Sequence, residues 1–170
     1  MFDFDNHEKG AEATDFANED NEWHKEVDAL VERSRSGKDA HVWIFFQKAI
    51  PASLARSFGF LLLDKGSESI NMKSFHYYDR MYPSQDVASS IGNLIALPLQ
   101  GQALKNGNSV FVDKNWNAYP DQWDILLNKT QKLSREDIET YMMKWQAELA
   151  ESKGKLAEAD MNNRPKPWKK

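Results

Sequence analysis

Asp3 and Asp5 stand two residues apart near the start of the chain, where they alternate with phenylalanines. Acidic and apolar residues that alternate with a period of two predict a β-strand over residues 1–5, with both carboxylates on one face and roughly 7 Å apart. Two carboxylates at this spacing repel each other unless a cation lies between them, and a hard divalent ion is the natural choice. The pair is therefore a candidate metal site. The alternative is a solvated strand edge that bears two acids.

A polar segment between two apolar runs offers the groups that bind a polyphosphate. Residues 34–41 read Ser-Arg-Ser-Gly-Lys-Asp-Ala-His, and so combine hydroxyls, cations, a flexible glycine and an imidazole. Hydroxyl and backbone donors beside Arg or Lys are common ligands of phosphate oxygens. The alternative is a polar hairpin turn, and a histidine that opens an apolar strand also suits a satisfied position in the core.

A third aspartate, Asp79, ends an apolar run that predicts a strand over residues 74–79. From that position its carboxylate could complete a metal site with the first pair. Gln85, Asp86 and Asn93 follow in a stretch suited to contacting a ligand. A plain turn after the strand is the alternative.

The elements that must position these residues follow from periodicity and from turn residues. Their order is strand, helix, strand, strand, helix, strand, hairpin and helix, which is typical of a mixed α/β or α+β domain. Ser134 is a good N-cap for the last helix. Besides the two strands above, we expect helices over residues 17–30, 51–63 and 135–152, strands over 31–36 and 41–46, and hairpin strands over 93–99 and 109–113.

The composition suits one soluble domain. The chain has 170 residues, of which 41% are hydrophobic and 28% are charged, and it has no cysteine. Without cysteine, disulfides and thiolate-bound zinc are excluded, and a reducing, cytoplasmic setting is expected. No apolar run approaches the roughly 20 residues that cross a bilayer, and the acidic start lacks the features of a signal peptide.

The net charge is −4, and the isoelectric point is near 5.6. A dedicated duplex-DNA binder is usually basic, because phosphate contacts supply most of its affinity. The charge therefore argues mildly against tight binding of nucleic acid without metal. It does not exclude an enzyme that recruits phosphates through divalent cations, because such a site needs carboxylates.

Taken in order, the three segments resemble the three catalytic motifs of archaeo-eukaryotic primases, and in particular the primase-polymerase domain of TOTE conflict systems and its CRISPR-associated relatives. The segments that carry the resemblance after the first aspartates are residues 32–37 and 41–46 for the second motif, 78–86 for the third, and 92–101, 109–113 and 119–123 beyond them. The resemblance covers roughly residues 1–133.

The resemblance implies an α+β fold, the archaeo-eukaryotic primase catalytic core, with a mixed sheet, an RRM-like unit and flanking helices. It implies that Asp3, Asp5 and Asp79 are catalytic and hold Mg²⁺ or Mn²⁺. It also implies that the second motif binds the triphosphate of the incoming nucleotide. The nucleotide-binding residues that it implies, with their neighbours by position and chemistry, are Ser36, Gly37, His41, Arg35, Lys38, Arg80, Gln85 and Asn93.

Three departures from the family pattern bear on function. Asp39 stands where the family usually has glycine; its carboxylate would repel a triphosphate, and a turn that needs positive φ there would be strained. The connection between Leu30 and Val31 is short. Met1 lies almost on the first motif, so we expect a fragment, a trimmed chain or a degenerate copy.

The function that the resemblance implies is template-directed nucleotidyl transfer from nucleoside triphosphates, as in a DNA primase-polymerase. The implied partners are nucleoside triphosphates, a single-stranded or primed template, and a helicase or nuclease of the same defence system, with no membrane. A module of the same fold that binds nucleotide or nucleic acid without catalysis is the alternative, and a structural remnant is a third possibility. The expected divisions are a truncated catalytic core (1–133), a C-terminal helix (134–153) and a polar tail (154–170).

Overall fold

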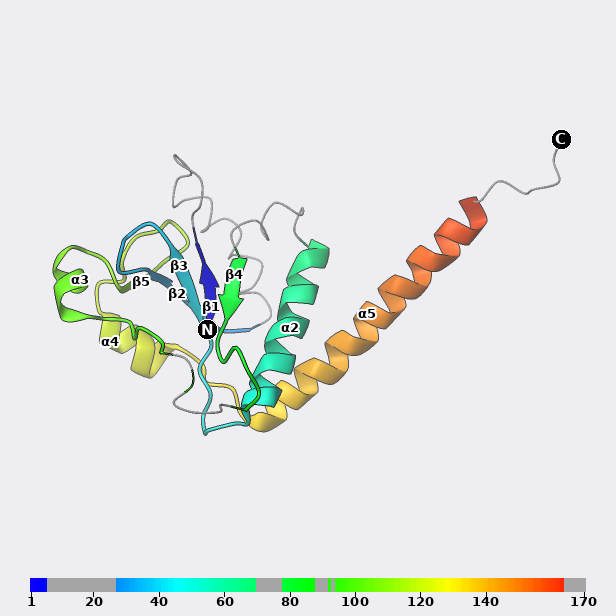
Figure 1. Ribbon diagram of the computed structural model, residues 1–170, viewed down its shortest axis with the longest axis horizontal. Coiled ribbons are helices and arrows are strands. Elements are labelled where there is room, and N and C mark those ends of the chain that lie inside the picture. Colours follow the sequence, from blue (N-terminus) through cyan, green and yellow to red (C-terminus); the bar gives the residue numbers. More distant parts are fainter. Residues whose placement is uncertain (6–26, 70–77, 88–91, 93, 164–170) are drawn as a thin grey trace.

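The fold is seen in a computed structural model, which describes residues 1–5, 27–69, 78–87, 92 and 94–163. Five strands in this part of the chain form one sheet, in the order β4-β1-β3-β2-β5 (Figure 1). Their bounds are Phe2–Phe4 for β1, Leu30–Arg33 for β2, Ala40–Trp43 for β3, Tyr78–Met81 for β4 and Val110–Val112 for β5. With its helices, the sheet makes an α+β domain.

The described strands pair antiparallel throughout, so this part of the sheet is not the mixed sheet that the resemblance implies. The reason is local for β2 and β3, because a short turn over residues 34–39 can join only antiparallel neighbours. Among the described residues, a parallel pairing occurs as an isolated bridge between Phe46 and Leu133.

The register of the sheet separates apolar from polar residues. Phe2 lies opposite Val42 on β3 and Met81 on β4, and all three side chains are buried. One residue further along β1, Asp3 lies opposite His41. Because successive side chains point to opposite faces of a strand, the sheet has an apolar face and a polar face at these positions.

Helix α2, Ala52–Ser69, packs on the apolar face, and helix α5, Arg135–Asn163, packs on α2. Phe58 of α2 stacks on Trp145 of α5 with ring centroids 5.7 Å apart, and both side chains are fully buried. Figure 1 shows that α5 continues past α2 and away from the sheet. In the described part of the chain, no helix combines the length and the apolar character needed to span a membrane.

Helix α2 contacts the sheet closely at a glycine, Gly59. A Cβ atom on Gly59 would collide with Met81 Sδ of β4 and would lie 3.4 Å from the ring of Phe2. The absence of a side chain at this point lets the helix backbone approach the apolar face directly. The position of α2 therefore depends on both strands at this edge of the sheet.

Ser134 is the N-cap of helix α5, as the sequence predicts, and its capping bonds with Asp137 are reciprocal. The Ser134 backbone N–H donates to Asp137 Oδ2 over 2.8 Å, and the Asp137 N–H donates to Ser134 Oγ over 3.1 Å. Two of the backbone donors that a helix start leaves without a partner are thereby satisfied.

The end of α5 differs from the prediction. The sequence predicts an end near Ser152, but the helix continues to Asn163, so residues 154–163 are helical rather than part of a polar tail. Gly154 costs a helix about 1 kcal/mol relative to alanine, but the lysine, leucine, alanine and glutamate residues that follow it are good helix formers. Residues 164–170 lie outside the described part of the chain.

Two predicted strands are shorter than expected at their carboxyl ends. β2 ends at Arg33 because the chain turns from Ser34 onward, and β3 ends at Trp43, with Phe46 contributing only its isolated bridge. The strand predicted to end at Asp79 is β4, which extends to Met81.

The hairpin predicted over residues 93–99 and 109–113 is wrong. Only the second segment forms a strand, β5, and it pairs with β2; the described residues of the first segment have no regular structure. Pro98 has no N–H for a strand ladder, and Leu99 has a φ of 62°, which ends an extended run. Helix α3, Gly101–Lys105, lies between the two segments.

The helix predicted over residues 17–30 is described only at its end. Residues 27–29 are not helical, and Leu30 already belongs to β2, so the strand begins one residue earlier than predicted. The remaining residues of this prediction, 17–26, lie outside the described part of the chain.

The side chain of Gln122 acts as a partner for β5. Its amide oxygen accepts from the Phe111 N–H over 2.6 Å, and its amide nitrogen donates to the Phe111 carbonyl over 2.9 Å. Gln122 is held at the start of helix α4, Gln122–Asp124, which continues into the π-helical turn η2, Ile125–Lys129. These bonds satisfy backbone groups that an edge strand would otherwise leave without partners.

Candidate functional site

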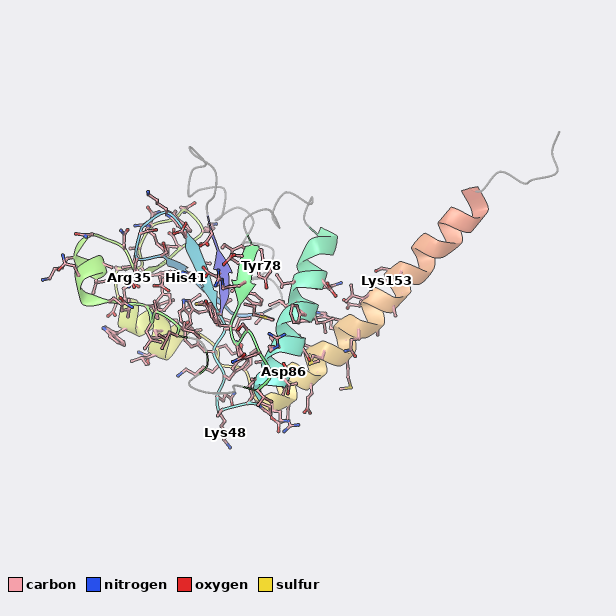
Figure 2. The ribbon with its side chains drawn as sticks, viewed as in Figure 1. Arg35, His41, Lys48, Tyr78, Asp86 and Lys153 are labelled. Atoms are coloured by element: carbon pink, nitrogen blue, oxygen red, sulfur yellow. The ribbon has the colours of Figure 1, made fainter. Side chains whose placement is uncertain are left out.

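Four side chains from neighbouring strands form a row across the polar face of the sheet, here termed the polar row. Its members, in the strand order β4-β1-β3-β2, are Arg80, Asp3, His41 and Glu32. Each residue lies directly opposite the next in the strand register, and opposite charges in such pairs attract. In Figure 2, His41 lies in the sheet, with Arg35 toward one side of the molecule and Tyr78 toward the other.

His41 lies between two carboxylates. Its Nδ1 is 3.1 Å from Glu32 Oε2, and its Nε2 is 3.4 Å from Asp3 Oδ1. Burial lowers the pKa of His41, but the hydrogen bonds and negative charges of Asp3 and Glu32 outweigh this effect and raise the pKa to about 9. The imidazole is therefore protonated at neutral pH, and it supplies the positive charge that two nearby carboxylates require.

Glu32 is a further member of the site. It opens the segment that resembles the second motif (residues 32–37), but it is not among the predicted functional residues. Its side chain is 1% exposed, and it accepts from His41 Nδ1 and from Trp43 Nε1 (2.7 Å) at one oxygen and from Ser109 Oγ (2.9 Å) at the other. A buried carboxylate is stable only when donors satisfy it in this way. Glu32 follows the apolar residues Leu30 and Val31 in a predicted strand, and an acid in such a place is a sequence signal of a buried functional carboxylate.

The edge strand β4 places Asp79 beside Arg80. Asp3 pairs with Arg80 and Phe4 with Tyr78, so that the register shifts and Asp79 has no partner residue on β1. A bulge of this kind turns a side chain away from the regular alternation, and such bulges often lie next to active sites. The Asp79 carboxylate forms an ion pair with the Arg80 guanidinium.

Two of the three predicted metal ligands, Asp3 and Asp79, are neighbours in the sheet. Asp3 and Asp79 lie on adjacent strands, and each has a cationic partner of its own, His41 or Arg80. Asp5 follows the end of β1 and is partly exposed. Among the described residues, no three His, Cys, Asp or Glu side chains are grouped closely enough to hold a metal ion. The donor chemistry fits Mg²⁺ or Mn²⁺, because both prefer carboxylate oxygens.

The turn between β2 and β3 has hydroxyl groups that bind an acid within the turn itself. Asp39 Oδ2 accepts from Ser36 Oγ over 2.8 Å and lies 3.4 Å from Ser34 Oγ. The Lys38 N–H donates to Ser36 Oγ over 3.0 Å, and the Asp39 N–H donates to Ser34 Oγ over 3.2 Å. The carboxylate of Asp39 thus takes up hydroxyl donors that a phosphate group would use.

The left-handed residue of this turn is Gly37, with a φ of 77°. A Cβ atom there would lie 2.7 Å from Asn108 Oδ1, which is the end of a flexible side chain, so the positive φ is the main reason for glycine at this position. Asp39 does not have a positive φ, so the strain that its replacement of a glycine predicts does not occur. The charge of Asp39 is the feature that bears on phosphate binding.

The other predicted nucleotide-binding residues lie around this site. Arg35 and Lys38 are exposed on the turn, and Gln85 is exposed after β4. Asp86 pairs with Arg56 of α2, with 2.7 Å between Oδ1 and Nε. The predicted residue Asn93 lies outside the described part of the chain.

The sheet is antiparallel, with an apolar face packed against a helix and a row of charged side chains on its other face. The chain is therefore an α+β domain with a polar site on the sheet. Residues 1–141 match the family described as the archaeo-eukaryotic primase domain of the TOTE conflict system. The chain therefore belongs to this family, which confirms the resemblance found in its motifs. Comparison with curated proteins gives no match to the chain.

Proposed function

We propose that this domain catalyses template-directed nucleotidyl transfer from nucleoside triphosphates, as a DNA primase-polymerase that uses Mg²⁺ or Mn²⁺. The observation that carries this proposal is the polar row, in which carboxylates from adjacent strands alternate with cations inside the region that matches the primase family. Such a row offers oxygen ligands for metal ions and positive charge for phosphates at one place.

The residues that would hold the metal are Asp3 and Asp79, with Asp5 as a further ligand. A bound divalent ion neutralises charge on the reacting phosphate and lowers the pKa of an attacking hydroxyl group. Asp3 and Asp79 must exchange their present cationic partners when they take up this role.

When the aspartates bind metal, His41 and Arg80 are released from them and can bind phosphate oxygens. When Asp3 binds elsewhere, the Nε2–H of His41 becomes available to a phosphate oxygen, while Nδ1 remains bonded to Glu32. In the same way Arg80 is released from Asp79. Both cations are already in place beside the carboxylates, so they stabilise phosphate charge without a large rearrangement.

The turn over residues 34–39 supplies the remaining phosphate donors. Ser36 offers a hydroxyl, Gly37 a backbone segment that can approach closely, and Arg35 and Lys38 exposed positive charge. Gln85 and Asn93 are further nucleotide-binding residues by position. A triphosphate must displace the Asp39 carboxylate from the hydroxyl donors of this turn.

In the proposed enzyme the described sheet belongs to the RRM-like unit of the catalytic core. Its partners are nucleoside triphosphates, a single-stranded or primed template, and a helicase or nuclease of the same defence system, in the cytoplasm. Family membership supports these partners.

A second function is favoured by one specific observation, the hydrogen bonds from the turn hydroxyls to Asp39. An acid held at the phosphate position suits a module that binds nucleotide or nucleic acid weakly and does not catalyse transfer.

A primer-extension assay with Mn²⁺ or Mg²⁺ separates the two functions. The enzyme lengthens a labelled primer on a template only when metal is present, and a chelator stops the reaction. If the folded protein gives no product with either metal, but calorimetry detects nucleotide binding, the proposed catalysis is wrong and the second function holds.

A further inference from the structure

Glu32 has more hydrogen-bond partners than a role in the strand alone requires. The side chain is buried, and three donors from two separate parts of the chain converge on its two oxygens. His41 and Trp43 belong to β3, whereas Ser109 precedes β5. A carboxylate held by three donors has little freedom to rotate, so it presents a fixed acceptor to each of them.

The imidazole of His41 is held unequally on its two sides. On the Nδ1 side lies Glu32, which is 1% exposed and bonded to two further donors; on the Nε2 side lies Asp3, whose side chain is 18% exposed. The Glu32 contact is the fixed one, and the Asp3 contact is the one that solvent or a ligand can replace. The hydrogen bond at one ring nitrogen determines which way the other nitrogen points.

Ser109 forms hydrogen bonds both with Glu32 and with the turn over residues 34–39. Its hydroxyl donates to Glu32 Oε1 over 2.9 Å, and its backbone N–H donates to the Ser34 carbonyl over 3.3 Å. Ser109 is fully buried and has a φ of 57°, a left-handed conformation that residues other than glycine adopt rarely and that persists only where the surroundings impose it. One residue therefore connects Glu32 with the start of the turn over residues 34–39.

We propose that Glu32 is a positioning residue, which holds His41 by Nδ1 and thereby directs Nε2–H toward the phosphate of a bound nucleoside triphosphate. The identity of that ligand rests on the proposed function, whereas the orientation of the ring does not. Glu32 itself is buried behind His41 and does not contact the nucleotide.

Two substitutions of Glu32 separate its shape from its hydrogen bonding. In Glu32→Gln, the amide oxygen can still accept from His41 and Trp43, while the amide nitrogen donates to Ser109 Oγ. In Glu32→Leu, the volume is similar but no acceptor remains. Positioning therefore predicts that Gln preserves the orientation of His41 and that Leu does not.

The first readout is the NMR signal of the His41 ring nitrogens in ¹⁵N-labelled protein, assigned with the His41→Asn variant. We expect a slowly exchanging, hydrogen-bonded Nδ1–H in the wild type and in Glu32→Gln, and its loss in Glu32→Leu. An unchanged Nδ1–H signal in folded Glu32→Leu overturns the proposal. If Glu32→Leu does not fold, Trp43→Phe removes one anchoring donor instead, and we expect faster Nδ1–H exchange; an unchanged rate overturns the proposal.

The second readout is calorimetric affinity for a nucleoside triphosphate in the presence of Mn²⁺. We expect affinity within about threefold of the wild type for Glu32→Gln and a loss of about tenfold for Glu32→Leu, on the order of one charge-assisted hydrogen bond. If no variant, nor the wild type, binds the triphosphate while the NMR signals change as expected, the proposed function fails and the positioning role stands. Equal affinity in wild type and folded Glu32→Leu contradicts a role toward the ligand.

Discussion

The two faces of the sheet are built from the same strands but are stabilised in opposite ways. On one face Phe2, Val42 and Met81 are buried in the apolar core on which helix α2 packs, and their contribution to stability depends on the area removed from water. On the other face Asp3 and His41 are stabilised by charge partners at specific distances.

This difference shows how closely stability and chemistry are combined in one short strand. β1 has three residues, and a shift of its register by one residue would turn Asp3 into the core and Phe2 toward the polar row. The apolar face therefore fixes the position of the charges. The charged contacts, in contrast, can be exchanged for a ligand without loss of the core.

The largest expected effect lies on the apolar face. Trp145→Ala removes a fully buried indole that stacks on Phe58 and Tyr141, and we expect a loss of about 3–5 kcal/mol in the free energy of unfolding. Urea denaturation measures it. Met143→Ala on the same helix, at a side chain that is 68% exposed, should change stability by less than about 0.5 kcal/mol. Equal effects of the two variants would contradict the assignment of the core.

The next effect lies on the polar face and concerns activity rather than stability. Asp3→Ala should lower the rate of primer extension by at least about a hundredfold, because it removes a metal ligand and the partner of His41. Asp64→Ala, at an exposed acid of α2, is the matched control and should retain full activity. The account does not survive an Asp3→Ala variant that is folded and fully active.

The charge on His41 makes the stability of the polar face depend on pH. In the folded protein without added metal its pKa is about 9, above the usual 6.5, because Asp3 and Glu32 favour the protonated ring. A raised pKa of this kind stabilises the fold fully below pH 6.5, and the stabilisation is lost as the pH rises through about 9. Urea denaturation across this range should show the decline in the wild type and a smaller one in His41→Asn. A flat wild-type profile would show that the ring is not held between the two acids.

The smallest effect concerns the turn. Asp39→Asn keeps the shape of the side chain and removes its charge, and we expect tighter binding of a nucleoside triphosphate by about fivefold, which corresponds to about 1 kcal/mol of relieved repulsion. Calorimetry measures the affinity, and Asp64→Asn serves as the control for net charge. Unchanged or weaker binding in Asp39→Asn would show that phosphate does not approach this carboxylate.

The sequence predicts those parts of the fold whose cause is local. The alternation around Asp3 predicts β1, the apolar spacing after Pro51 predicts α2, and Ser134 predicts the start of α5. It does not predict the failure of residues 93–99 to form a strand, because their apolar composition suits a strand and only Pro98 points the other way.

As with the fold, the sequence predicts only those parts of the site that have a local cause. The motifs indicate Asp3, His41 and Arg80 one by one, but their places in one row depend on strand register, which pairs residues distant in the chain. Glu32 escapes prediction because its burial depends on Trp43 and on the distant Ser109. The apolar Leu30 and Val31 beside it indicate that this acid is buried, but they do not identify its partners.

Paramagnetic NMR with Mn²⁺ most directly tests the central claim, that Asp3 of the polar row and the neighbouring Asp79 hold a divalent metal ion. When Mn²⁺ is added to ¹⁵N-labelled protein, we predict that signals of Asp3, Asp79 and His41 broaden first, that Lys153, far along α5, broadens least (Figure 2), and that Asp3→Ala removes the selective broadening. Broadening centred on another part of the protein, or none at a concentration that supports primer extension, would contradict the account.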